Sequence, residues 1–265
     1  MDKSSKIVRS LAPKKFWDSK WSSFPFRSLP FNPRRRNFRD LHGLFLRNLP
    51  RQENLEFLEI GCYPGRYLWY FNKYFGYQVS GMDYIDWCCR DANNLLKNCG
   101  VQGEIIQADI FSYEPASPGR QWDIVASFGF IEHFENSREA VKRHLELLKP
   151  GGFLVLVVPN HQGIYGKILK KTFPEIFRAH RIMSRETILK ELQSSGEIEI
   201  VEEGYYGRLG FGHTGLVEKL MDKNPFIYHA ARVLVFGIEN TARILPRSAA
   251  LSPYIAVIAR NKNHG

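Results

Sequence analysis

LEIGCYPGRY, residues 58–67, is the stretch that decides the fold of this 265-residue chain. An apolar run that predicts a β-strand ends inside it, and two glycines, Gly61 and Gly65, lead from that strand into a helical pattern. A second predicted strand, residues 78–82, follows and ends at Asp83. Strand, helix and strand in this order make a β-α-β unit, whose two strands run parallel.

The alternation of strands and helices continues on both sides of this unit. We expect strands over residues 55–60, 78–82, 104–108, 123–128 and 153–158, and helices over 38–48, 66–75, 86–98 and 137–148. Beyond Pro159, a mixed stretch precedes a helix over 184–194 and two last strands over 197–201 and 253–259. The sequence therefore predicts an α/β fold with a Rossmann-like, doubly wound, mostly parallel sheet of seven strands.

A helical insertion separates the last two predicted strands. About fifty residues, 204–251, connect them, far more than the few residues typical of a connection, which indicates structure of its own. The insertion opens with the glycine-rich stretch YYGRLGFGHTG and then has helical patterns near 216–222 and 226–245. We divide the chain into an N-terminal arm with the start of a leading helix (1–51), a core (52–160) and the remainder of the same domain (161–265).

The net charge of +10 resides in the arm. Residues 1–51 carry thirteen Lys and Arg against three Asp, so the rest of the chain is neutral overall. The arm also carries the aromatic residues Phe16, Trp17, Trp21, Phe24, Phe26 and Phe31. A basic segment with interleaved aromatic residues can dock on nucleic acid, on an anionic membrane or on its own domain, and the sequence leaves these three open.

Cysteine usage and hydropathy exclude several classes of protein. Cys62, Cys88, Cys89 and Cys99 show no C-x-x-C spacing, so neither a zinc site nor a disulfide framework is expected. The longest apolar runs, such as residues 153–158, are too short to span a membrane, and the start of the chain lacks the apolar stretch of a signal peptide. We expect a cytoplasmic protein, with peripheral membrane contact as an alternative.

The residues of the glycine turn indicate which class of ligand it binds. A dinucleotide-binding turn needs glycines at the positions that Tyr63 and Arg66 occupy. The pattern Glu59-x-Gly61-x-x-x-Gly65 suits a ligand without phosphate but with an amino-acid tail. A carboxylate can accept from the ammonium of such a tail, and backbone amides can donate to its carboxylate.

Over residues 55–160 the sequence resembles the class I S-adenosylmethionine-dependent methyltransferases. The resemblance is to the small-molecule branch, which includes quinone-biosynthesis, glycan and natural-product tailoring enzymes. It rests on the glycine turn, on acids after the second and third strands, Asp83 and Asp109, and on SFGFIEHFEN followed by LKPGGFLVLVVPN. Tyr63 departs from the pattern, since the family often has a small residue there. The resemblance implies that the strand over 253–259 is antiparallel.

The resemblance implies that the core binds S-adenosyl-L-methionine as its cofactor. The residues that it places at the cofactor are Glu59, Gly61, Cys62, Tyr63, Gly65, Asp83, Tyr84, Asp109, Ile110, Phe128 and Gly129. Asp83 is expected to accept from the ribose hydroxyls, Asp109 to accept from the adenine amino group, and Tyr84 to pack on the adenine. For each acid taken alone, the alternative is a carboxylate that caps a loop or a helix.

Methyl transfer is an in-line displacement at an activated carbon, so most of the catalysis is expected from proximity and alignment. A base is needed only for a weakly acidic hydroxyl acceptor, and neither a metal nor a nucleophile is required. His133 is the candidate base, because it follows the fourth strand at the sheet edge where open α/β folds bind ligands. Glu132 could orient it or meet the substrate. Alternatively, His133 only hydrogen-bonds loop backbone.

Substrate contacts are expected outside the shared core. The candidates are His161, Tyr165 and His180, and then Tyr205, Tyr206, Arg208 and His213 in a glycine-rich stretch that could form a mobile lid. Each is alternatively a surface or packing residue. The helix over 226–245 is apolar along one face, which is typical of a helix packed on the core, of a homodimer contact or of a membrane-surface helix.

Three functions follow from these patterns. The leading one is methylation of oxygen, ahead of nitrogen or carbon, in a small-molecule or glycan acceptor. SFGF at residues 127–130 argues against methylation of adenine or glutamine nitrogens, which uses a Pro-Pro-aromatic run there. The second is an RNA methyltransferase whose basic arm contacts phosphates, although nucleic acid is the less expected partner. The third is a cofactor-binding but catalytically silent partner subunit.

Overall fold

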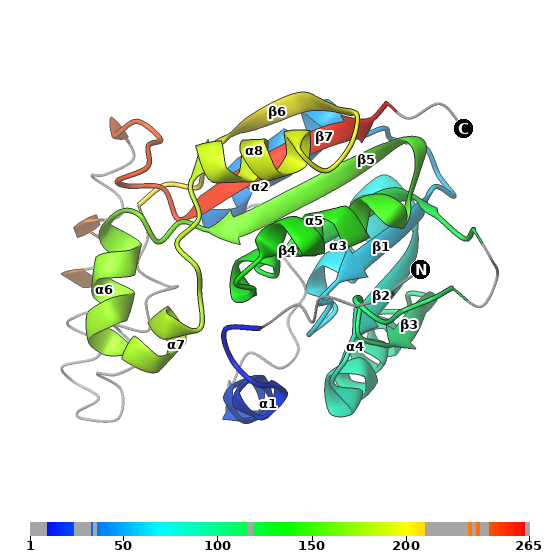
Figure 1. Ribbon diagram of the computed structural model, residues 1–265, viewed down its shortest axis with the longest axis horizontal. Helices are drawn as coiled ribbons and strands as arrows, with labels where there is room; N and C mark the ends of the chain where they lie inside the picture. The colour runs from blue at the N-terminus through cyan, green and yellow to red at the C-terminus, as the bar shows by residue number, and fades with distance from the viewer. Residues whose placement is uncertain are drawn as a thin grey trace, which may run out of the picture.

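The computed structural model describes residues 10–23, 33, 36–115, 119–209, 233–234, 237–238 and 244–262. These residues form one sheet of seven strands in the order β3-β2-β1-β4-β5-β7-β6 (Figure 1). The strands are β1 (Glu56–Ile60), β2 (Gln78–Asp83), β3 (Gly103–Gln107), β4 (Trp122–Phe128), β5 (Leu148–Pro159), β6 (Ile198–Tyr206) and β7 (Tyr254–Asn261). β1 to β5 pair in parallel, and β7 is antiparallel to both β5 and β6. The predicted mostly parallel sheet with an antiparallel last strand is confirmed.

Helices cover both faces of the sheet. They are α1 (Lys14–Ser23), α2 (Arg36–Asn48), α3 (Arg66–Phe75), α4 (Asp86–Asn98), α5 (Ser137–Glu146), α6 (Ile164–Thr172), α7 (Pro174–Arg178) and α8 (Arg185–Gln193), with a 3-10 turn η1 (Ile131–His133). In Figure 1, α5 and α8 lie in front of the sheet and α2 behind it. Phe57 belongs to the core shared with α2 and α3, and Leu58 to the core shared with α5 and α8. Successive strand residues point to opposite faces, so β1 contributes to both cores.

The leading helix α2 shows why the apolar pattern predicted it. Phe38, Leu41, Leu44 and Phe45 are spaced by three, three and one residues, which places them on one helical face. All four are buried in the core. Full burial of such a side chain contributes about 1.5–3 kcal/mol, so this face is enough to hold the helix on the sheet.

Three predicted element bounds are wrong. β6 runs to Tyr206, where it pairs with Tyr254, so Tyr205 and Tyr206 belong to a strand and not to a glycine-rich lid. β5 begins at Leu148, because this residue pairs with Trp122 ahead of a register shift. β3 ends at Gln107, which leaves Asp109 in the following loop and not at the strand end.

The connections after β5 also differ from the prediction. The mixed stretch over 161–183 contains two helices, α6 and α7, that the sequence did not indicate. The predicted helices near 216–222 and 226–245 lie outside the described residues, apart from short helical pieces at 233–234 and 237–238. Within the described ranges, no helix is long and apolar enough to cross a membrane.

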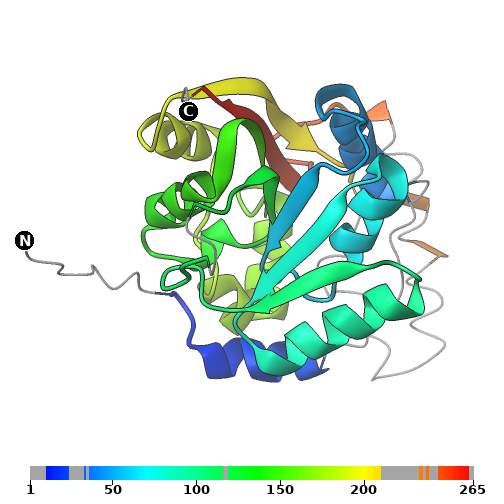
Figure 2. The same ribbon diagram turned by 90° about the vertical axis from the view of Figure 1, so that its right-hand side faces the viewer.

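Residues 10–23 of the arm dock on the chain's own domain. Lys14 donates from Nζ to the carbonyl oxygen of Tyr84 at 2.7 Å. The amide of Leu11 donates to the carbonyl oxygen of His133 at 2.8 Å. Figure 2 shows α1 beside α4. The described part of the arm therefore covers the carboxyl ends of β2 and β4, the sheet edge at which open α/β folds bind ligands.

Candidate functional site

The turn between β1 and α3 adopts a backbone conformation that requires glycine. Gly61 and Gly65 have φ angles of 72° and 87°. A Cβ on Gly61 would lie 2.8 Å from the ring of Phe130, so glycine lets the turn approach the segment after β4. The amides of Gly61 and Cys62 donate to the Met82 carbonyl, at 2.8 Å and 3.1 Å. These two amides tie the turn to β2, so they are not the donors expected for a ligand carboxylate.

Glu59 of β1 places a buried carboxylate next to this turn. Only 2% of the residue is exposed, and its Oε2 has no hydrogen-bond partner in the described structure. Burial, and then the nearby Asp83, raise the pKa of the Glu59 carboxyl well above its usual value, while the amide of Leu68 lowers it. An unsatisfied buried acceptor costs free energy, so a ligand ammonium would stabilise it. This feature fits the amino-acid tail of the expected cofactor.

Asp83, at the end of β2, is also buried, but one of its carboxylate oxygens already accepts a hydrogen bond within the protein. Oδ1 accepts from the amide of Ile85 at 3.0 Å. Burial raises the pKa of the Asp83 carboxyl to about 6, although the amides of Ile85, Tyr63 and Tyr84 and the charge of Lys14 act in the opposite direction. Two carboxylate oxygens offer about four lone pairs, so acceptor capacity remains for the hydroxyls of a ligand.

The residues predicted at the adenine do not line the cavity beside the turn, and each has contacts within the protein. The exposed Asp109 carboxylate accepts from the amide of Phe111 at 3.0 Å, which is the local contact that the capping alternative describes. Ile110 is buried in the core on the α5 face. The ammonium of Lys14 lies 5.1 Å from the ring centre of Tyr84. In this structure, α1 therefore covers the residue expected to pack on adenine.

A cavity of about 390 Å³ opens beside the glycine turn. The lining residues are Trp17, Lys20, Trp21, Gly61, Tyr63, Tyr67, Phe128, Gly129, Glu132, His133, Val157, Pro159, Ile176, His180 and Tyr254. The cavity thus brings together Gly61, Tyr63, Phe128, Gly129, Glu132 and His133 of the predicted site. It does not include the predicted cofactor residues Glu59, Cys62, Gly65, Asp83, Tyr84, Asp109 and Ile110 in its walls.

His133 has both ring nitrogens against backbone carbonyls. Nδ1 is 3.2 Å from the oxygen of Ala179, and Nε2 is 3.1 Å from the oxygen of Gly129. Burial, and then the neighbouring His180, lower the pKa of His133 to about 3, so the ring is neutral near pH 7. A neutral ring has one N–H, so it donates to one of these two carbonyls, and its other nitrogen lies against the second carbonyl oxygen without a hydrogen bond. The geometry corresponds to the alternative in which His133 hydrogen-bonds loop backbone.

Glu132, next to it, has the properties of a proton acceptor. It is 1% exposed, and neither carboxylate oxygen has a hydrogen-bond partner of standard geometry in the described structure. Oε1 lies 3.9 Å from Nε2 of His133. Burial raises the pKa of the Glu132 carboxyl to about 8, although the amides of Glu132 and Phe130 lower it. A carboxyl with a pKa near neutrality can take up a proton and release it again, as a general base must.

The cluster of Glu132, His133 and His180 has too few free ligand atoms for a metal ion. The three residues place one candidate atom each within 4.8 Å of one another. His180 has Nδ1 2.6 Å from the carbonyl of Ile176, which leaves only its Nε2 free. Both nitrogens of His133 face carbonyls. One carboxylate and one imidazole are fewer than the three protein ligands of an ordinary catalytic metal site.

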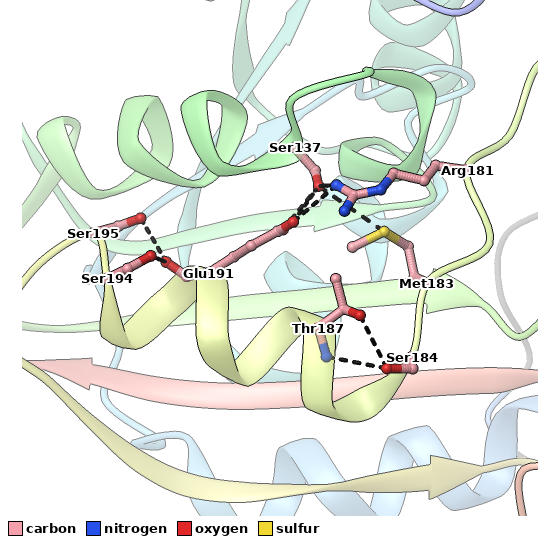
Figure 3. A network of polar contacts seen from close by, with 8 residues as sticks. All are labelled: Ser137, Arg181, Met183, Ser184, Thr187, Glu191, Ser194 and Ser195. Carbon is pink, nitrogen blue, oxygen red and sulfur yellow. Dashed lines mark hydrogen bonds and ion pairs between the residues drawn. The ribbon is translucent and has the colours of Figure 1, made fainter.

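A buried polar network fixes the loop that carries His180 (Figure 3). The guanidinium of Arg181 donates to Ser137 Oγ at 2.5 Å and to Glu191 Oε1 at 2.9 Å, and Ser137 Oγ donates to Glu191. The amide of Arg181 donates to the carbonyl of Glu132 at 2.7 Å. The network therefore joins α5, α8 and η1 around one loop. Its members lie far apart in the sequence, so no local pattern pointed to it.

The predicted substrate residues do not gather at the cavity. His180 lines it, whereas His161, Tyr165, Tyr205, Tyr206 and Arg208 do not, and His213 lies outside the described residues. Tyr165 is buried in α6 and packs in a small apolar cluster with Leu209. The hydroxyl of Tyr205 donates to Gln162 at 3.3 Å. For these two tyrosines, the observed contacts are the packing and surface roles stated as the alternative.

Two tryptophans of the arm are among the cavity residues that the sequence did not assign to the site, with Lys20, Tyr67, Val157, Pro159, Ile176 and Tyr254. Trp17 and Trp21 of α1 line the cavity, and their ring centroids are 6.2 Å apart in a stacked arrangement. A spacing of four residues places both indoles on one face of a helix. This spacing was the signal that α1 packs an aromatic face on the domain.

Comparison with known proteins identifies the kind of domain. A family model described as a methyltransferase domain matches residues 34–196, which is more than half of the chain. No curated protein matches the sequence.

Solved structures share the fold at low sequence identity. The [4+2]-cyclase SpnF aligns with a TM-score of 0.58 at 18% identity, over 84% of this chain and 81% of its own. Mycolic acid cyclopropane synthase CmaA1, complexed with SAH and CTAB, gives 0.58 at 14% identity, over 84% of each chain. N-methyltransferase NodS from Bradyrhizobium japonicum WM9, in complex with S-adenosyl-l-homocysteine, gives 0.53 at 17% identity, over 96% of each chain. At these identities the likeness shows the fold alone.

Proposed function

The chain belongs to the methyltransferase-domain family, and from this premise we propose that it transfers a methyl group from S-adenosyl-L-methionine to a small-molecule acceptor. One observation supports the proposal most directly. The glycine turn after β1 adjoins a cavity, and the buried Glu59 carboxylate beside that turn lacks a partner at Oε2. An ammonium group is the natural partner for such an acceptor, and the proposed methyl donor carries one on its amino-acid tail.

The residues of the cavity have three tasks in this reaction. When bound, S-adenosyl-L-methionine supplies a methyl group on a positively charged sulfur, and the acceptor forms its new bond to that carbon as the carbon–sulfur electron pair stays on sulfur. The chain must hold the acceptor in line, exclude water and take up a proton. Aromatic walls exclude water, and Glu132 is the buried group suited to the proton. His133 then acts as a positioning residue, through its contacts with the Gly129 and Ala179 carbonyls.

The acceptor atom is not decided by the fold. Proteins with this fold include a cyclase, a cyclopropane synthase and an N-methyltransferase. The sequence favours oxygen of a small molecule or glycan, ahead of nitrogen. The buried carboxylate of Glu132 among aromatic walls favours nitrogen.

The other functions have less support. For an RNA methyltransferase, the arm would have to offer its charges to phosphates, but Lys14 and Lys20 contact Tyr84 and Glu175 of the chain's own domain. A silent partner subunit would bind the cofactor without turnover. A homodimer contact or a peripheral membrane contact through residues 226–245 stays a prediction, because most of that segment lies outside the described residues.

Calorimetric titration with S-adenosylmethionine and S-adenosylhomocysteine tests the proposal. We expect micromolar binding, and we expect Asp83→Ala to weaken it by about 1–3 kcal/mol, the cost of losing a buried hydrogen-bond partner. Asp86→Ala, at an exposed position close by, is the matched control and should change the affinity by less than about 0.5 kcal/mol. Absence of binding of both ligands would contradict the proposal, and binding without turnover of any acceptor would favour the silent subunit.

A further inference from the structure

Among the residues that the structure describes, no Lys or Arg forms an ion pair with the buried carboxylate of Glu132. The nearest ionisable groups are the imidazoles of His133, 3.9 Å away, and His180. Burial lowers the pKa of both histidines, so both are neutral near pH 7. An ionised carboxylate at this place is therefore not neutralised by the two rings beside it.

Two cationic side chains near the cavity, both among the described residues, are paired with other acids. Lys20 of α1 lines the cavity and lies 3.1 Å from Glu175. Arg181, on the loop packed against η1, lies 2.9 Å from Glu191. Burial also lowers the pKa of His161, the next imidazole outward, to about 3. A buried ionised carboxylate is expensive unless it is paired, so the Glu132 carboxyl, whose pKa burial raises to about 8, keeps its proton near pH 7, and a bound cation would favour its ionised form.

The cavity walls suit a cation as well. Six aromatic side chains line it: Trp17, Trp21, Tyr63, Tyr67, Phe128 and Tyr254. The face of an aromatic ring attracts a cation, and the attraction grows when water is excluded. Aromatic walls together with one carboxylate are the arrangement that recognises ammonium ions.

Resting on the proposed function, we propose that the methyl acceptor is an amine, bound as its ammonium with the charged nitrogen toward Glu132. Glu132 takes one N–H proton from this ammonium. The lone pair that is freed on nitrogen forms the bond to the methyl carbon, while the carbon–sulfur bonding pair leaves with sulfur. A bound ammonium adds a positive charge that favours the ionised form of Glu132, and it supplies the proton that Glu132 accepts, whereas a neutral alcohol adds no charge.

Two probes of equal shape and different charge test this proposal. Choline carries a quaternary ammonium, and 3,3-dimethylbutan-1-ol has a carbon in place of that nitrogen. The full chain, saturated with S-adenosylhomocysteine and kept in EDTA, is titrated with each probe by calorimetry. We expect choline to bind at least about tenfold more tightly.

Glu132→Gln keeps the shape of the side chain and removes its charge. In this variant we expect the preference for choline to fall below about threefold, with the affinity for S-adenosylhomocysteine unchanged. Glu135→Gln, at an exposed position in the same segment, is the matched control and should keep the full preference.

Equal affinity for the two probes, or no binding of choline to the loaded protein, would overturn the amine acceptor. An undiminished preference in Glu132→Gln would overturn the role of this residue. Failure of S-adenosylhomocysteine to bind appears earlier in the same experiment and counts against the proposed function instead. If Glu132→Gln does not fold, the wild-type preference still decides, together with mass spectrometry of products from amines, phenols and alcohols. Methylation of phenols or alcohols alone would overturn the proposal.

Discussion

The indole of Trp17 packs on the imidazole of His133, with ring centroids 4.2 Å apart and planes tilted by 55°. Trp17 belongs to the N-terminal helix α1, and His133 to η1 after β4. The same indole lies 5.9 Å from the ring of His180, across the cavity lining. A helix of the basic arm therefore forms one wall of the candidate active site.

Trp17→Ala should weaken the packing of α1 on the domain. Loss of a buried tryptophan costs about 3–5 kcal/mol in a core, and α1 depends on its aromatic face for attachment. We expect α1 to detach while the sheet stays folded. Limited proteolysis should then cut within residues 10–23 much faster than in the wild type, whereas Lys15→Ala, an exposed neighbour, should leave the rate unchanged. Equal protection of Trp17→Ala would contradict the packing of α1.

Gly61→Ala should weaken cofactor binding more than the strain of its positive φ angle alone would. Gly61 has φ of 72°, and a Cβ there would lie 2.8 Å from Phe130. Gly100 has φ of 69°, but a Cβ there would meet nothing within 4 Å, so Gly100→Ala is the matched control for backbone strain. We expect calorimetry to show at least about tenfold weaker binding of S-adenosylhomocysteine for Gly61→Ala only. Similar losses in both variants would show that strain, and not the contact, matters.

Glu191→Ala should destabilise the fold by breaking the network of Figure 3. The change removes the acceptor of both Arg181 and Ser137, and Ser137 is fully buried. Leaving buried donors unsatisfied costs about 1–3 kcal/mol, which urea denaturation followed by circular dichroism can measure. Lys190→Ala, at an exposed position of the same helix, is the control and should cost less than about 0.5 kcal/mol. Equal midpoints for the two variants would argue against the network.

The pH dependence of the free energy of unfolding should show that the pKa of the Glu132 carboxyl is raised in the folded protein. Between its usual pKa of 4.5 and the folded value of about 8, the folded carboxyl keeps a proton that the unfolded chain has lost. The folded state binds more protons in this window, so the free energy of unfolding falls as pH rises, by up to about 1.4 kcal/mol per unit. Glu132→Gln lacks this contribution, and the other titrating groups cancel in the difference.

Urea denaturation of both proteins from pH 5 to pH 8 measures that difference. We expect the free energy of unfolding to shift steadily in favour of Glu132→Gln as the pH rises. Parallel pH profiles would mean that Glu132 titrates normally in the folded protein.

The stretch over residues 58–67 and the apolar runs around it were enough to predict the sheet. Strand and helix patterns are local, because side chains alternate along a strand and recur every three to four residues along a helix. Gly61, Phe128, Gly129 and Glu132 could be placed at one edge of the sheet for the same reason, since the carboxyl ends of parallel strands meet there. The cavity lining includes all four.

The chemistry of that edge could not be predicted from the sequence. The sequence favoured His133 as the base, but the partners of its ring nitrogens include Ala179, on a loop far along the chain. Asp109 was assigned to adenine, but its carboxylate is exposed and accepts from Phe111.

The sequence by itself determined the β-α-β order, the glycine turn and the family resemblance, and it predicted a site at one edge of the sheet. Only the tertiary structure decided that Trp17 lines the cavity and that the buried Glu132 has no hydrogen-bond partner there among the described residues. Secondary structure follows from short-range spacing along the chain. Burial, hydrogen-bond satisfaction and pKa depend on which distant segments pack together, and these quantities set what a side chain can do.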